Sequence, residues 1–304
     1  MEDELTRMAR EMIAASMAKK AQAETPKPAE EEEVVPEKPK EITLTEEQDK
    51  NLAVPQRMFQ ESDQRMRYKG ADWARKITEE TATVVGAGGI GSHVIFNLAR
   101  AAIGMLYVYD GDTVDAVNMA GQLYRVEDIG KFKVDALKDI VMQYTPTLKG
   151  CFFSEMFQGD EPLSPITITA LDSMSARKLV FESWLRYISG MNDVQKNKTL
   201  FIDGRMSASS YQVFCFRASQ PEKIEMYRKK CLFSDAQADA TSCSFKATTH
   251  IGSGIGSYIM SIIQEHLHLE DLGFFEKSIK FFNEFSTDFG VTLTQRTQWQ
   301  FRKV

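Results

Sequence analysis

Four glycines and one aspartate have the types and spacing of a phosphate-binding turn. Gly86, Gly88, Gly89 and Gly91 lie close together, and Asp110 follows 24 residues after Gly86. Gly86 allows a tight turn, Gly88 lets a phosphate approach the backbone, and Gly91 lets the next helix pack closely. Asp110 is placed to accept hydrogen bonds from a ribose. A crowded crossing of helix and strand also selects glycines, so that structural explanation stays open.

The elements that must position residues 86–91, here called the glycine turn, are visible around it. A β-branched run, Thr81–Val85, precedes the turn, and apolar residues at helical spacing follow it. A second strand, Met105–Tyr109, ends at Asp110. Strand, turn, helix and strand in this order form half of a nucleotide-binding unit. The same order binds nicotinamide dinucleotides, so it also allows an NAD-dependent oxidoreductase.

A series of polar residues after Asp110 has no role in binding a dehydrogenase cofactor. The series comprises Asp112, Asn118, Gln122, residues 128–130 and Lys133. With the run GAGGIGS, it resembles the ThiF/MoeB/HesA superfamily, whose pattern reads roughly G-x-G-G-x-G-S, D-x-D-x-V-x-x-x-N-x-x-R-Q and D-x-G-x-x-K. The resemblance extends over about residues 50–295 and is strongest in residues 83–133.

The resemblance implies a reaction and a role for each matching residue. Members of the superfamily use ATP to adenylate the C-terminal carboxylate of ubiquitin-like or sulfur-carrier proteins. Asp110 would bind the ribose of ATP and Asp112 would support the site. Asn118 and Lys133 would contact phosphate, and Gln122 would line the nucleotide site with the glycine turn. The substrate carboxylate attacks the α-phosphorus, while a lysine and a bound cation offset the charge on the oxygens.

A second acidic position follows a strand in the middle of the chain. Residues 166–171 read as a strand that ends at Asp172, before a helix that Ser173 or Ser175 can cap. The resemblance places Mg²⁺ on this aspartate through the pattern D-x-x-x-x-R, with Arg177 in support. Open α/β sheets bind ligands at the carboxyl ends of their strands, so we predict Asp172 as the metal ligand. The alternative is an aspartate that only caps a helix.

One position departs from the superfamily pattern, because Gly121 stands where the pattern has arginine. The change removes an expected phosphate contact. Arg205, predicted at an edge of the sheet, is a candidate to replace that charge, with a surface ion pair as the alternative. The resemblance also implies that an arginine of a preceding helix reaches ATP in the partner subunit of a homodimer, with the candidates Arg57, Arg65 and Arg67.

The four cysteines are too sparse and irregular for a disulfide framework and suit a reducing compartment. Members of the superfamily often bind zinc through two C-x-x-C pairs, but only Cys231 and Cys243 occur in that region. A tetrahedral zinc site needs four nitrogen or sulfur ligands, so we expect no zinc. Either cysteine can be a nucleophile or a buried structural thiol.

The alternation of strands and helices predicts an α/β fold with a Rossmann-like mixed sheet flanked by helices. The N-terminal half should be parallel, and the C-terminal strands, at 211–216 and within 277–294, antiparallel. Residues 187–198 read as a surface loop, and a helix at 258–267 follows a glycine-rich run. Residues 1–44 read as a helix-prone arm and an acidic, proline-rich linker, and residues 45–304 as the adenylyltransferase domain.

Composition limits the remaining possibilities. The net charge is −6, and residues 1–48 carry thirteen acids and seven bases, so the rest of the chain is neutral. Nothing indicates a basic nucleic-acid surface. No apolar run has the length of a membrane span, and no signal-peptide block occurs at the N-terminus. We therefore expect a cytoplasmic protein that contacts neither membrane nor nucleic acid.

Three functions follow from these residues. The leading hypothesis is an adenylyltransferase that uses ATP and Mg²⁺ to activate the free C-terminus of a small ubiquitin-like protein, a sulfur-carrier protein or a peptide. The second is a nucleotide-binding scaffold or partner subunit that lost turnover with the arginine at position 121. The third, an NAD-dependent oxidoreductase, leaves Asn118, Lys133 and Asp172 without a role.

Overall fold

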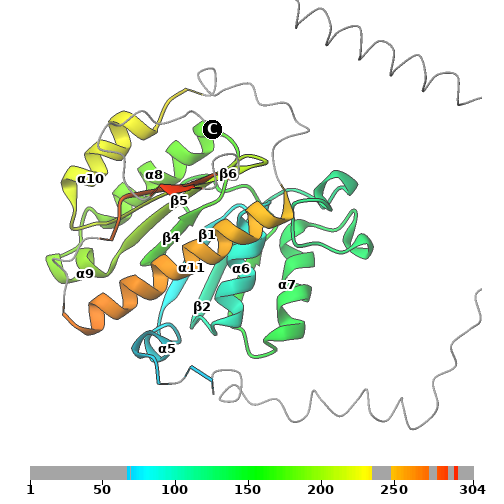
Figure 1. The fold of residues 1–304 in the computed structure, drawn as a ribbon, viewed down its shortest axis with the longest axis horizontal. Helices are drawn as coiled ribbons and strands as arrows, with labels where there is room; N and C mark the ends of the chain where they lie inside the picture. Colours follow the sequence, from blue (N-terminus) through cyan, green and yellow to red (C-terminus); the bar gives the residue numbers. More distant parts are fainter. Residues whose placement is uncertain (1–66, 69, 235–247, 274–278, 287–290, 294–304) are drawn as a thin grey trace, which may run out of the picture. The chain divides into compact units, whose positions relative to one another are not determined.

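The computed structural model describes residues 67, 68, 70–234, 248–273, 279–286 and 291–293. Residues Met1–Pro55 form a separate unit that lies outside the described residues, as does the start of the second unit, Gln56–Val304. The predicted arm and linker are therefore not described here. The second unit contains one eight-stranded sheet with the order β3-β2-β1-β4-β5-β6-β7-β8 (Figure 1).

The sheet is parallel in one half and antiparallel in the other, as predicted. The parallel strands are β1 (Thr81–Val85), β2 (Met105–Tyr109), β3 (Gly150–Phe153), β4 (Ile166–Thr169) and β5 (Leu200–Met206). The antiparallel strands are β6 (Ser210–Arg217), β7 (Phe282–Ser286) and β8 (Val291–Leu293). The chain runs outward from β1 to β3 and then returns to place β4 on the other side of β1. The strand order thus reverses between β1 and β4, where open α/β sheets bind ligands.

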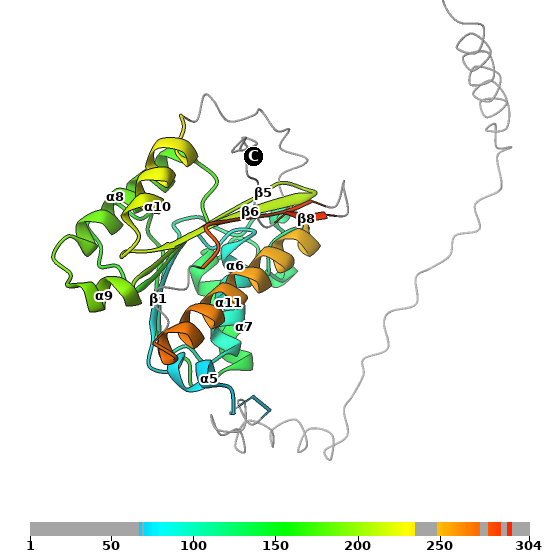
Figure 2. The same ribbon diagram turned by 60° about the vertical axis from the view of Figure 1, so that its left-hand side comes forward.

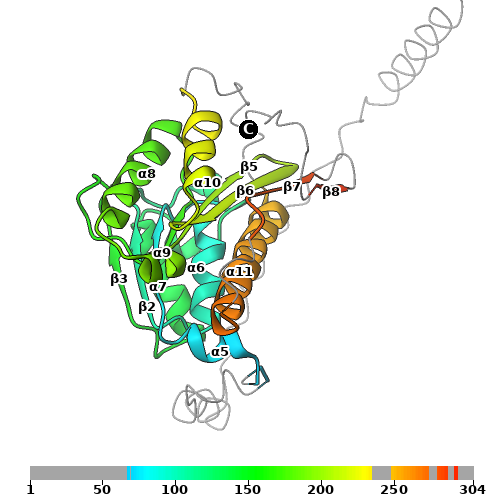
Figure 3. The ribbon, with the colours of Figure 1, turned by 90° about the vertical axis from the view of Figure 1, so that its left-hand side faces the viewer.

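Helices cover both faces of this sheet (Figures 2 and 3). One face carries α5 (Asp72–Lys76), α6 (Gly91–Arg100), α7 (Lys133–Tyr144) and α11 (Thr249–Asp271). The other face carries α8 (Met174–Ile188) and α10 (Pro221–Met226), and α9 (Asp193–Lys198) follows α8. No helix among the described residues is long and apolar enough to cross a membrane.

Each face of the sheet has its own apolar core. On the side of α6 and α11 the core is aliphatic, and Leu98, Leu106 and Ile259 are fully buried in it. On the side of α8 it is aromatic: the ring of Phe181 packs edge-on against Phe201, with centroids 5.7 Å apart. The strands between the two cores are rich in β-branched and aromatic residues, which fit a sheet buried on both faces.

Two sequence predictions about helices were wrong. Residues 187–198 are not a loop, because α8 continues to Ile188 and α9 follows. Asn192 caps α9 by accepting a hydrogen bond from the backbone N–H of Gln195 at 2.9 Å. The glycine-rich run does not precede a helix but lies inside α11, which packs closely on α6: a Cβ added at Gly256 would lie 2.7 Å from the Cβ of His93.

Candidate nucleotide-binding site

The glycine turn joins β1 to α6 at the point where the strand order reverses. Gly86 has a φ of 99°, which favours glycine, and a Cβ there would lie 2.5 Å from the carbonyl oxygen of Ala170. A Cβ at Gly91 would lie 1.8 Å from the carbonyl oxygen of Gly86. A Cβ at Gly88, in contrast, would meet no atom within 4 Å. Packing therefore requires two of these glycines, and Gly88 faces open space.

The backbone of the glycine turn offers hydrogen-bond donors to that space. Within the described part of the chain, the N–H groups of Gly88, Gly89 and Ile90 donate to no acceptor. The turn leads into α6, ten residues long, whose N-terminus adds the positive end of a helix dipole. Free N–H groups at the start of a helix form a binding site for phosphate.

Asp110 lies directly beside the glycine turn. One carboxylate oxygen accepts the N–H of Ala87 at 2.6 Å, and the other accepts the N–H of Asp112 at 2.9 Å. Burial raises the pKa of Asp110, and the Ala87 N–H and Lys133 oppose that increase. Each oxygen of a carboxylate has a second lone pair. The geometry is therefore compatible with the predicted contact to a ribose hydroxyl.

Lys133 and Asp112 form an ion pair next to Asp110. The lysine is the first residue of α7, and its Nζ lies 2.7 Å from Asp112 Oδ2. The Lys133 side chain is 9% exposed, whereas the Asp112 side chain is 53% exposed. A solvated carboxylate can be displaced from an ammonium group by a phosphate at small cost. The structure thus brings the two residues together as a charged pair that is compatible with the predicted phosphate contact.

Asn118 and Gln122 lie on the segment between Asp112 and α7. Asn118 ends the short 3₁₀ helix η1 (Ala116–Asn118), and its Oδ1 accepts the N–H of Asp115 at 2.8 Å. This oxygen therefore has a structural role that spacing alone did not show. The Oε1 atom of Gln122 is buried and has no hydrogen-bond partner among the described residues.

Asp172 follows the carboxyl end of β4 by three residues, and the residue before it, Leu171, packs near Gly86 of the glycine turn. A Cβ at Gly86 would lie 3.3 Å from the Leu171 side chain. The alternative role for Asp172, a helix cap, is wrong, because Ser173 Oγ accepts the N–H of Ala176 and so caps α8. Arg177 supports this segment by donating to the carbonyl oxygen of Leu171.

The exposed carboxylate of Asp172 fits a Mg²⁺ ion that is bound jointly with phosphates. No group of three or more His, Cys, Asp or Glu side chains among residues described in the structure forms a metal site of its own. Mg²⁺ in nucleotide sites takes one or two carboxylates and completes its octahedral shell with phosphate oxygens and water. One carboxylate near a turn that can bind phosphate is compatible with that requirement.

Arg205 does not lie where the sequence predicted it. Its side chain is 4% exposed, its Nε donates to Asp203 Oδ2 at 2.7 Å, and an Nη donates to the carbonyl oxygen of Cys231 at 2.9 Å. It is therefore neither a surface ion pair nor an exposed substitute for the arginine missing at Gly121. A guanidinium that is part of the buried core is not available to a nucleotide without unfolding its surroundings, which corrects the predicted catalytic role.

The structure describes one of the two candidate cysteines and one of the three candidate arginines. Cys231 is buried, and burial raises the pKa of its thiol to about 12, so it is a structural cysteine and not an activated nucleophile. Arg67 is exposed in the turn before α5. Cys243, Arg57 and Arg65 lie outside the described residues.

Sequence reasoning missed Tyr124. Its hydroxyl donates to the carbonyl oxygen of Ala87, inside the glycine turn, at 2.6 Å. No spacing in the sequence indicates this contact, because Tyr124 lies 37 positions after Ala87.

The fold and this site define a class: an α/β protein with a glycine turn, open to a phosphate, at the reversal of its strand order. The ThiF family model matches residues 61–296 of the chain, which is most of its length. The chain therefore belongs to the ThiF family.

Relatives in sequence match shorter stretches. A probable molybdopterin-synthase adenylyltransferase of Porphyra purpurea is 28% identical over 144 residues, which are 45% of this chain and 37% of that protein. Ubiquitin-like modifier-activating enzyme 5 of Caenorhabditis elegans is 38% identical over 74 residues, 24% of this chain and 18% of that protein. The chain thus matches well under half the length of these relatives.

Solved structures share the fold. A crystal structure of PaaA covers 96% of this chain and 82% of its own, with a TM-score of 0.56 and 16% identity. The tRNA N6-threonylcarbamoyladenosine dehydratase TcdA of E. coli, crystallised with ATP, covers 70% of this chain and 95% of its own, with a TM-score of 0.52 and 16% identity. At these identities the likeness supports the architecture alone.

Proposed function

We propose that this protein binds Mg²⁺ and ATP at the glycine turn and adenylates the C-terminal carboxylate of a small ubiquitin-like protein, a sulfur-carrier protein or a peptide. One observation carries the proposal: the unengaged N–H groups of Gly88–Ile90, the carboxylate of Asp110 and the ammonium group of Lys133 converge at the reversal of strand order. Relatives of the same family are named as adenylyltransferases, and one neighbour in fold was crystallised with ATP.

Each group has a chemical task in that reaction. Asp110 accepts the ribose hydroxyls and thereby fixes the distance from the sugar to the glycine turn. The N–H groups of the turn bind phosphate oxygens, and Lys133 exchanges Asp112 for the phosphate whose charge increases as the carboxylate attacks. Mg²⁺, on Asp172, would supply further positive charge to the phosphates. The products are an acyl adenylate and pyrophosphate.

A non-catalytic function has one observation in its favour. Gly121 is buried against α11, where its carbonyl oxygen would lie 3.1 Å from a Cβ at Gly252. The structure thus gives position 121 a packing role in place of the arginine of the family pattern. A scaffold that binds ATP without turnover is therefore the second candidate. An oxidoreductase is disfavoured, because the pair of Lys133 and Asp112 has no task in binding NAD.

Partners and location complete the proposal. The acceptor of the adenylyl group is a protein or peptide with a free C-terminus, since a carboxylate is the nucleophile. We further propose a homodimer in the cytoplasm, on the family pattern alone. Neither a nucleic acid nor a membrane is part of the proposed activity.

Thermal unfolding with either Mg·ATP or NAD tests the nucleotide site. At about 100 times its dissociation constant, a ligand stabilises a folded protein by roughly 2.7 kcal/mol. We expect stabilisation by Mg·ATP, a smaller one in Lys133→Ala, and none with NAD. Stabilisation by NAD alone would contradict the proposal.

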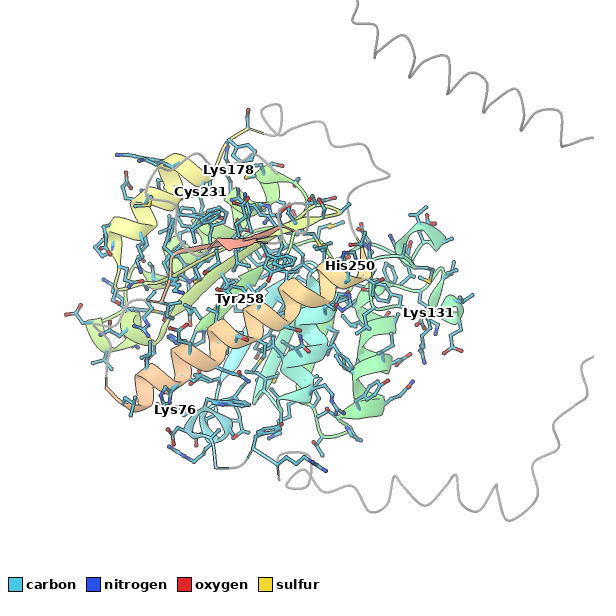
Figure 4. All side chains as sticks on the ribbon, viewed as in Figure 1. Lys76, Lys131, Lys178, Cys231, His250 and Tyr258 are labelled. Carbon is cyan, nitrogen blue, oxygen red and sulfur yellow. The ribbon has the colours of Figure 1, made fainter. Side chains whose placement is uncertain are left out.

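Lys131→Ala is the matched control. This lysine precedes Lys133 by two residues, but its Nζ pairs with Asp128 Oδ1 at 2.9 Å on the outer side of the segment before α7 (Figure 4). Removing it changes the net charge equally and should leave the stabilisation by ATP intact. Pyrophosphate release in the presence of candidate carboxylate substrates then separates the enzyme from the scaffold, because a scaffold would bind ATP and release none.

A further inference from the structure

The peptide group between Ala87 and Gly88 lies in the centre of the glycine turn. Side chains bind both backbone polar groups of Ala87, its N–H and its carbonyl oxygen. Ala87 is fully buried. Its N–H donates to Asp110 Oδ2 at 2.6 Å, and its carbonyl oxygen accepts the hydroxyl of Tyr124 at 2.6 Å. Both bonds are short, and the tyrosine is 9% exposed.

The bond to the carbonyl oxygen also determines the direction of the next N–H group. A trans peptide is planar, and its C=O and N–H point in opposite directions. The described residues contain no cis peptide bond. The carbonyl oxygen of Ala87 and the N–H of Gly88 belong to one such plane. Since Tyr124 binds the oxygen, the N–H of Gly88 points away from Tyr124, and it donates to no acceptor among the described residues.

The two flanking peptides are held separately, because the N–H of Ala87 donates to Asp110 and the carbonyl oxygen of Gly88 accepts the N–H of Ser92 at 3.0 Å. Among the described residues, the hydroxyl of Tyr124 is the partner of the peptide between Ala87 and Gly88 itself. Glycine at position 88 lacks a Cβ, so the plane can rotate through conformations that other residues avoid. Rotation would turn the carbonyl oxygen, a negative end, toward a bound phosphate. The buried hydroxyl of Tyr124 therefore favours the orientation in which the N–H end of this peptide dipole faces a nucleotide.

We propose that Tyr124 is a positioning residue of the nucleotide site, which orients the peptide between Ala87 and Gly88 so that the N–H of Gly88 faces the phosphates. This inference rests on the proposed binding of ATP. It adds a side chain that the ThiF-type pattern of residues 83–133 did not single out.

The surroundings of Tyr124 support a positioning role. The preceding residue, Leu123, donates its N–H to Ser92 Oγ at 3.1 Å, so the segment is attached to the first turn of α6. Burial raises the pKa of Tyr124 above its usual value, with the charge of Asp110 contributing. The hydroxyl consequently stays protonated, and able to donate, at neutral pH. The same segment carries Asp112 and Lys133, so the tyrosine links the lysine side of the site to the turn.

Titration of ATP and adenosine against wild type and Tyr124→Phe tests the inference. Adenosine has the ribose but no phosphate. We expect Tyr124→Phe to bind ATP about tenfold more weakly, as for loss of one hydrogen bond to a charged group, and to bind adenosine as wild type does. Tyr68→Phe is the matched control: its hydroxyl also donates to a backbone carbonyl oxygen, that of Arg100, at 3.2 Å and at the other end of α6. It should leave both affinities unchanged.

Two results would overturn the inference while leaving the proposed function intact. One is an ATP affinity of Tyr124→Phe equal to that of wild type. The other is an equal loss of affinity for ATP and adenosine, which indicates general loosening. If Tyr124→Phe does not fold, 4-fluorophenylalanine at position 124 fills the volume of the hydroxyl without donating, and the same outcomes apply. A wild-type protein that binds no ATP would overturn the proposed function itself.

Discussion

Asp110 and Asp203 both lie toward the carboxyl ends of parallel strands, but their carboxylates have different partners. Asp110 accepts two backbone N–H groups and is 8% exposed. Asp203 is fully buried and is bound by Arg177, by Arg205 at 2.7 Å and by the hydroxyl of Tyr227 at 2.9 Å. One aspartate lies at the edge of an open site, and the other lies in the middle of a closed cluster.

The type of donor explains why one carboxylate is available to a ligand and the other is not. Backbone N–H groups are neutral, so Asp110 keeps a charge and lone pairs that a ligand can use. Two guanidinium groups and a hydroxyl take three of the about four lone-pair positions of Asp203, and the excess positive charge stays buried with it. Arg177 also donates to the carbonyl oxygen of Leu171, next to Asp172. Arg205 also donates to the carbonyl oxygen of Cys231. Asp203 therefore connects segments, whereas Asp110 is available to bind.

Replacing each aspartate by asparagine tests this comparison most strongly. Asp203→Asn leaves two buried guanidinium groups without a carboxylate, which should cost about 3–5 kcal/mol of the free energy of unfolding. Asp110→Asn keeps one acceptor oxygen and should cost no more than about 1–2 kcal/mol, while it weakens ATP binding. Urea unfolding, followed by tryptophan fluorescence to which the buried Trp184 contributes, measures both. Equal losses of stability would remove the distinction between a closed and an open carboxylate.

A pair of glycine substitutions separates packing from binding within the glycine turn itself. Gly91→Ala brings a Cβ to 1.8 Å from the carbonyl oxygen of Gly86, so we expect a loss of about 3 kcal/mol in stability, at the upper end of overpacking costs. Gly88→Ala meets no protein atom within 4 Å and should fold normally. Its methyl group would enter the space assigned to phosphate and reduce the affinity for ATP. Thermal unfolding and ATP titration of both variants distinguish these outcomes. Normal ATP binding by Gly88→Ala would place the phosphates elsewhere.

The parts of the fold that the sequence predicted depend on local patterns. The β-branched run of β1, the apolar run of β2 and the glycines between them determine strand, turn and helix within about thirty residues. The mixed sheet followed from the order of strands and helices, and the ThiF pattern located Asp110 and Lys133. The structure brings these residues together at one edge of the sheet, as expected from parallel strands.

The parts that the sequence did not predict depend on distant residues. Arg205 was expected at a sheet edge, but its environment is set by Asp203, Cys231 and the aromatic ring of Phe214, 4.6 Å from its guanidinium carbon. The sequence placed the start of the last helix at residue 258, whereas α11 begins at Thr249 and includes the glycines, whose packing partner α6 is about 160 positions away in the chain. A single sequence does not show which faces of two elements meet.

Glu80 is a third carboxylate to compare, and it lies at the opposite edge of the sheet. Unlike Asp110 and Asp203, it lies near another negative charge, that of Glu270. Glu80 directly precedes β1, and burial followed by the charge of Glu270 raises its pKa from 4.5 to about 7, while Lys198 and Lys76 oppose the shift. Glu270 already pairs with Lys198 at 2.8 Å and with Lys76 at 3.6 Å, beside the last turn of α11 (Figure 4). The cations are therefore largely engaged by Glu270.

The sign of the effect on stability follows from the raised pKa. Between pH 4.5 and about 7 the folded protein retains a proton on Glu80 that the unfolded chain has lost, so the contribution of this group to stability falls as the pH rises. Glu80→Gln should match wild type near pH 4 and exceed it by about 1–2 kcal/mol at pH 8, after allowance for solvent screening. Unfolding in urea across this pH range measures the difference.

Glu79→Gln is the control. The Glu79 side chain is 63% exposed, so this variant should follow wild type at every pH. If the difference in free energy of unfolding between Glu80→Gln and wild type does not change with pH, the pKa of Glu80 is not raised in the folded protein, and the prediction is wrong.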